Sequence, residues 1–97
     1  MIDLGRPVKI GDFEHRVGKT FTVHAAGHNV PVVLRACQPL PGSKREGGAF
    51  RLEFAGPLDP RLGQGIFPFM IDHDQYPIFI VPLGAGQRTM RYEAVYF

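Results

Sequence analysis

The chain has 97 residues and a net charge of only +2, and its 12 Gly and 9 Pro interrupt it often. This length suits one domain with one hydrophobic core, and such frequent turn residues favour β-structure over helices. The weak, scattered charge excludes the strong positive patch of a typical nucleic-acid-binding protein, so we predict no nucleic-acid partner. Cys37 is the one cysteine in the chain, which excludes an intrachain disulfide framework and a zinc site built on several thiolates.

No apolar run in the sequence is long enough to cross a bilayer. The opening residues Met1–Pro7 also lack the uninterrupted apolar stretch of a signal peptide. We therefore predict that the chain has no cleaved leader and no membrane partner, and that it lies in the cytoplasm unless it is part of a larger particle.

Taken in chain order, the pattern first predicts a short helical turn over Ile10–Val17. Alternation of apolar and polar residues then predicts strands over 19–24, 30–37, 49–54 and 90–97, and apolar runs predict two more over 65–71 and 76–83. In the second strand Ala36 should share the core face with Leu34, and Arg35 should face outward. The whole chain, 1–97, should be a single all-β domain: a small antiparallel barrel or sandwich of about six to seven strands.

Gly- and Pro-rich segments connect these strands. We expect a hairpin at 25–29, a longer connection at 39–48 whose part 41–48 is mobile, a rigid crossing at 55–60 and a turn at 84–86.

The strands over 65–71 and 76–83 are apolar on both faces. In the first, the face opposite Phe67, Phe69 and Ile71 would still be apolar, and in the second Phe79 and Val81 oppose Ile78 and Ile80. So small a domain has little material to cover both faces of a sheet, which predicts contact with a protein partner or a second copy of the chain. The predicted interface residues are Ile66, Pro68, Met70, Phe79 and Val81. Pro68 cannot donate a ladder hydrogen bond and should lie at an edge or a bulge.

The sequence also offers an alternative, a metal site. His24 and His28 are four residues apart, a spacing that brings two imidazoles together on a helix, but HAAGH follows a strand and lacks the glutamate base of metalloprotease motifs. Asp72, His73 and Asp74 could begin a divalent-cation site, although the further oxygen ligands of a calcium loop do not follow. A charged turn before a strand starting at Tyr76 is the other interpretation, and the one we favour.

No catalytic residue or cofactor is predicted. Ser43 is the one serine and lies in the loop without a G-x-S-x-G elbow around it, and Cys37 ends an apolar strand, where a thiol is usually packed and inert. Gly84 and Gly86 form a lone G-x-G before a strand instead of a helix, so a nucleotide-binding loop is not expected.

Four segments resemble a family of small bacterial domains of unknown function, about this length and often encoded beside phage tail-collar-like proteins. They are Phe50–Pro57, Leu62–Phe67, Ile78–Pro82 and Met90–Tyr96, and F-x-x-x-V-G-x-x-F-x-V over 13–23 fits more weakly. Gly63 stands where the family usually has proline, and Phe67-Pro68-Phe69 replaces a more regular strand. The shared residues are turn glycines, prolines and core aromatics.

The resemblance and the apolar strands together predict a non-enzymatic structural or accessory component of a phage-derived or tail-like assembly. It would act through protein contacts, in the cytoplasm or within such a particle. The alternative is a small β-barrel that binds a ligand or a metal and could be an enzyme. Its site would consist of His24, His28, Asp72, His73 and Asp74.

Overall fold

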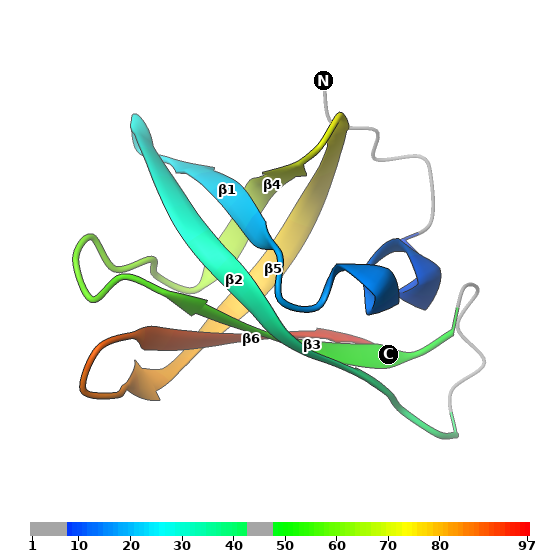
Figure 1. Cartoon of the computed structure of the whole chain (residues 1–97). Coiled ribbons are helices and arrows are strands. Elements are labelled where there is room, and N and C mark those ends of the chain that lie inside the picture. Colours follow the sequence, from blue (N-terminus) through cyan, green and yellow to red (C-terminus); the bar gives the residue numbers. More distant parts are fainter. Residues whose placement is uncertain (1–7, 43–47) are drawn as a thin grey trace.

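The computed structural model describes residues 8–42 and 48–97, which form a closed antiparallel β-barrel (Figure 1). The strands follow each other around the barrel in the order β1-β2-β3-β6-β5-β4, and β4 closes the ring against β1. The elements are η1 (Ile10–Asp12), η2 (Glu14–Arg16), β1 (Thr20–Ala25), β2 (His28–Pro39), β3 (Phe50–Gly56), β4 (Gly65–Ile71), β5 (Asp74–Ala85) and β6 (Met90–Tyr96). The predicted all-β barrel is thus confirmed. No helix in the described ranges is long and apolar enough to cross a membrane.

Local sequence patterns located the strands well. The bounds of β4 are those predicted, and the helical segment before β1 is present as two short 3-10 turns, η1 and η2. β2 and β5 are longer than predicted at both ends. Gly84 and Ala85 belong to β5, so the turn before β6 starts at Gly86, two residues later than predicted. The Gly86 N–H donates a hydrogen bond to the Thr89 carbonyl in this turn (2.8 Å). Residues 43–47 of the loop predicted to be mobile lie outside the described residues.

The prediction for Ala36 was wrong. Leu34 pairs with Phe54, but the register then shifts, so that Ala36 pairs with Glu53 and Cys37 with Leu52. This bulge at Arg35 breaks the two-residue alternation, because a bulge adds one residue to one strand. Cys37, instead of Ala36, packs against the core beyond the bulge.

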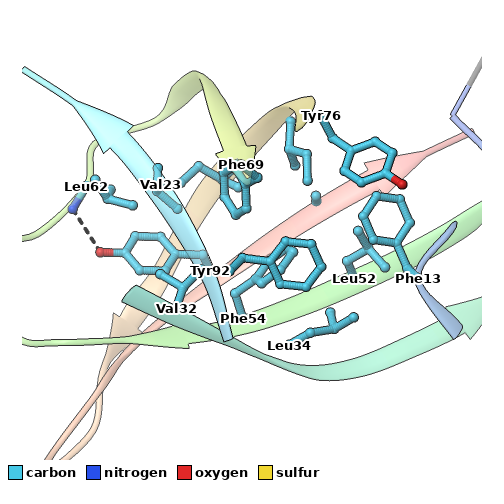
Figure 2. Close-up of a cluster of buried hydrophobic side chains, with 14 of the residues drawn as sticks. Phe13, Val23, Val32, Leu34, Leu52, Phe54, Leu62, Phe69, Tyr76 and Tyr92 are labelled. Atoms are coloured by element: carbon cyan, nitrogen blue, oxygen red, sulfur yellow. Dashed lines mark hydrogen bonds between the residues drawn. The ribbon is translucent and has the colours of Figure 1, made fainter. Parts of the chain in front are cut away.

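The barrel interior is filled with side chains, many of them aromatic (Figure 2). Phe21, Phe54 and Phe69 form its centre, with ring centroids 4.9–6.4 Å apart. Phe13, from the turn between η1 and η2, is fully buried and contacts Phe21, Phe50 and Tyr76 at one end of the barrel. Phe13 therefore closes the core at that end.

Leu62 closes the other end, from the segment between β3 and β4. Its backbone N–H donates to the hydroxyl oxygen of buried Tyr92 (2.8 Å), which ties this irregular segment to β6 (Figure 2). Gly56 at the end of β3 allows close contact with Val32 of β2, since a Cβ at position 56 would lie 2.9 Å from the Val32 Cγ1. Both barrel ends are therefore occupied by the chain itself.

The seam between β1 and β4 is short. It consists of the pairs Thr22–Met70 and Val23–Phe69, whereas β4 pairs with β5 along its full length. Pro68 lies just beyond this seam, opposite Pro77 of β5. β4 is not an edge strand in the closed ring, and its register shows no bulge at Pro68, so the predicted edge or bulge is not found. A residue without an N–H is tolerated there because the pairs with β1 end at Phe69.

Candidate functional site

The outer surface of β4 and β5 carries a continuous row of apolar side chains. Ile66 pairs with Phe79 and Pro68 with Pro77, so these side chains lie next to each other across the two strands. The exposed fractions are 70 % for Ile66, 47 % for Phe79 and 37 % for Met70, and Pro68 and Val81 are half-buried. We call Ile66, Pro68, Met70, Pro77, Phe79 and Val81 the outer apolar face. It includes the five residues singled out in the sequence, and none of them is part of the barrel core.

Polar side chains mark the borders of this face. Val81 pairs with Glu93 of β6 on one side. On the other, the imidazole of His24 contacts the Met70 sulfur through Nε2 and the Asn29 side-chain oxygen through Nδ1. Between these borders the face carries no charged side chain, so it has the pattern of an interface core with a polar rim.

Asp72 and Asp74 belong to an ion-pair cluster around Arg16 of η2. The Arg16 Nη2 donates to Asp74 Oδ2 (2.6 Å) and lies 3.5 Å from Asp72 Oδ2, and its Nη1 donates to the Tyr76 hydroxyl (2.9 Å). Arg16 is buried, and the cluster fastens the helical turns to the β4–β5 hairpin. The triplet is therefore a charged turn, as favoured, but the turn is shorter than predicted: β5 begins at Asp74.

Burial and hydrogen bonding act against each other in this cluster. Desolvation tends to lower the pKa of Arg16, but the hydrogen bonds with Asp74 and Tyr76 offset this and leave the pKa raised. Burial raises the pKa of Tyr76, and the hydrogen bond from Arg16 only partly opposes it. Arg16 therefore stays a cation and Tyr76 a neutral phenol at neutral pH.

The structure does not assemble the alternative metal site. His24 contacts Asn29 and Met70, His28 starts β2 at the barrel end closed by Leu62, and the two aspartates face Arg16. Among residues 8–42 and 48–97, no group of three or more His, Cys, Asp or Glu side chains could hold a metal ion.

A second charged cluster covers the outside of β3 and β6. Arg51 pairs with Glu93 and with Glu53 (2.8 Å), and Glu53 also pairs with Arg91 (3.0 Å). Hydrogen bonds from Arg91 and Arg51 lower the pKa of Glu53, despite some desolvation. The alternation of these strands indicated outward-facing charges, but not this network, because that requires the register of β3 on β6.

Cys37 is half-buried and makes no disulfide. Burial, and to a lesser degree the charge of Glu14, raise the pKa of its thiol. A raised pKa reduces the fraction of the nucleophilic thiolate at neutral pH, so the arrangement does not activate Cys37.

Comparisons with known proteins identify the family of this domain but no characterised relative. No curated protein and no solved structure is significantly similar to the chain. The sequence model of one family, described as "Domain of unknown function (DUF6916)", matches residues 8–96, which include every described strand of the barrel and the two 3-10 turns. The chain therefore belongs to the DUF6916 family of small domains of unknown function.

Proposed function

We propose that this domain is a non-enzymatic structural component of a protein assembly and packs its outer apolar face against a second copy of the chain. The observation that carries the proposal is the exposure of Ile66 and Phe79, which pair across β4 and β5. Large apolar side chains grouped in this way on a small domain are typical of protein interaction sites. Because the interior is already filled by other side chains, these residues have no place inside the barrel.

A second copy is the partner that fits this face. The six residues carry no charge, so two copies that meet face to face bring no like charges together. A stable interface buries about 800 Å² on each partner, more than six side chains supply. The ion-paired residues beyond the border, such as Glu93, Arg51 and Arg91, would form its polar rim.

We further propose that the assembly is phage-derived or tail-like. This part rests on the resemblance to small bacterial domains encoded beside phage tail-collar-like proteins. Such an assembly suits a domain that makes protein contacts and catalyses no reaction.

Size-exclusion chromatography with light scattering tests the interface. We expect the wild-type chain to form dimers or larger assemblies, and the variants Phe79→Asp and Met70→Asp to be monomers with an unchanged circular dichroism spectrum. Val17→Asp is the matched control, because Val17 and Phe79 are both 47 % exposed and Val17 lies outside the face. A wild-type chain that stays monomeric at all accessible concentrations contradicts the proposal, as does an equal loss of association in the control.

A further inference from the structure

The barrel has a pocket at the end closed by Leu62, away from the outer apolar face. Its volume is about 200 Å³. Its lining includes buried Val30 and Leu62 and half-buried Ala25 and Phe67. The hydrogen bond from the Leu62 N–H to Tyr92 fixes this part of the lining on β6.

The short β1–β4 seam explains why the pocket exists. The last pair of this seam is Val23–Phe69, and the next pair on the same face would be Ala25 with Phe67. These residues do not pair, and both line the pocket. The barrel wall is therefore unpaired between β1 and β4 beyond this end of the seam, where the pocket lies.

Two nitrogen-bearing side chains lie at the pocket, His28 from the start of β2 and Arg61 from the segment before β4. Both are exposed. The Arg61 Nε–H donates to the Leu58 carbonyl (3.1 Å), which orients the guanidinium, and no described carboxylate forms an ion pair with it. None of the residues that line the pocket is acidic. An apolar hollow with an oriented guanidinium at its rim is complementary to an apolar anion.

We propose that this pocket binds an apolar group of about the size of one amino-acid side chain that carries a carboxylate. An apolar cavity of about 150 Å³ is large enough for benzene, so a phenyl or leucyl group fits here, whereas drug-sized ligands need about 300 Å³ or more. Arg61 would donate to the carboxylate, and the imidazole of His28 would supply a second donor. Such a group occurs both in a free aromatic or aliphatic acid and in the last residue of a protein chain.

Nuclear magnetic resonance titration of the labelled chain with N-acetylphenylalanine, and in parallel with N-acetylphenylalaninamide, tests this proposal. We expect the acid to shift the amide signals of Ala25, His28 and Gly63, and to bind about tenfold more tightly than the neutral amide, as a hydrogen-bonded ion pair implies. A peptide ending in phenylalanine is the third arm. Tighter binding of the peptide than of the acid assigns the ligand to a protein C-terminus, and equal binding assigns it to a free acid.

Three variants complete the test. Arg61→Gln should lose the preference for the acid, and Ala25→Leu should block both ligands by filling the pocket. Arg35→Gln removes the same charge from an exposed position on β2 and should bind like the wild type. The amide spectrum of each variant checks its fold. Equal affinity for acid and amide, shifts that are absent or spread over the barrel, or an Arg61→Gln variant that keeps its preference would overturn the proposal. The result is independent of the oligomeric state.

Discussion

At the scale of single residues, Arg16 joins two parts of the sequence that lie far apart. It lies in a short 3-10 turn, yet its guanidinium bonds to Asp74 and Tyr76, 58 and 60 positions further along the chain. Such a turn has too few hydrogen bonds of its own to persist alone. We infer that Arg16 fixes the turns on the barrel and thereby holds Phe13 in its end.

Replacement of Arg16 by methionine, which keeps much of the apolar stem, should therefore destabilise the fold. We expect a loss of about 2 kcal/mol in the free energy of unfolding, because the buried Tyr76 hydroxyl and the Asp74 carboxylate lose their charged donor. Urea unfolding followed by circular dichroism measures it. Arg35→Met is the control, and as a change at an exposed site it should stay within about 0.5 kcal/mol. The same small effect for Arg16→Met would show that the cluster contributes nothing.

At the scale of elements, the charged cluster on β3 and β6 links the two strands on their outer side. Glu53 is its centre, since it accepts from both Arg51 and Arg91. Its pKa is lower in the folded state than the value of about 4.3 in an unfolded chain. The stabilisation is thus present above that pH and is lost as the pH falls through the folded-state pKa, because the unfolded state then binds the proton more readily.

The variant Glu53→Gln should accordingly be less stable than the wild type at pH 7, and the difference should shrink at pH 3. Urea midpoints at the two pH values measure this change. Glu14→Gln is a suitable control, because Glu14 is exposed and its carboxylate forms no ion pair with a described residue. A difference between Glu53→Gln and the wild type that is constant with pH would mean that the effect comes from packing and not from the ion pairs.

At the scale of the whole molecule, stability depends on closing both ends of a small barrel. Phe13 is fully buried and contacts three aromatic rings from different strands. Phe13→Ala should lower the free energy of unfolding by about 3–5 kcal/mol, since it removes these contacts and leaves a cavity. That is a large part of the total of about 5–15 kcal/mol expected for a small domain.

Urea unfolding and thermal melts of the Phe13→Ala variant measure this loss. Val95→Ala removes an apolar side chain that is 51 % exposed on β6, and it should change the stability little. If the two variants behaved alike, the helical turns would be an appendage of the barrel and not its plug.

Much of this fold could be predicted from the sequence, because the two-residue alternation that makes a strand is a local property. Gly65–Ile71 is an example: its bounds, and the division of its residues between a face with Phe69 and a face with Ile66, follow from the order of its residues. The apolar excess of that outward face was likewise evident before the structure. Even the two 3-10 turns were indicated by a local pattern over 10–17.

Only the tertiary structure decided the features that depend on register and closure. The bulge at Arg35 turned Cys37 inward in place of Ala36, and it is set by how β2 pairs with β3. The ion pair of Arg16 with Asp74 joins residues 58 positions apart. The hydrogen bond from the Leu62 N–H to the Tyr92 hydroxyl joins residues 30 positions apart. The pocket beside Arg61 exists because the β1–β4 ladder stops early. Alternation states which side of a strand a residue occupies, but the neighbour that it meets there depends on how the ring of strands closes.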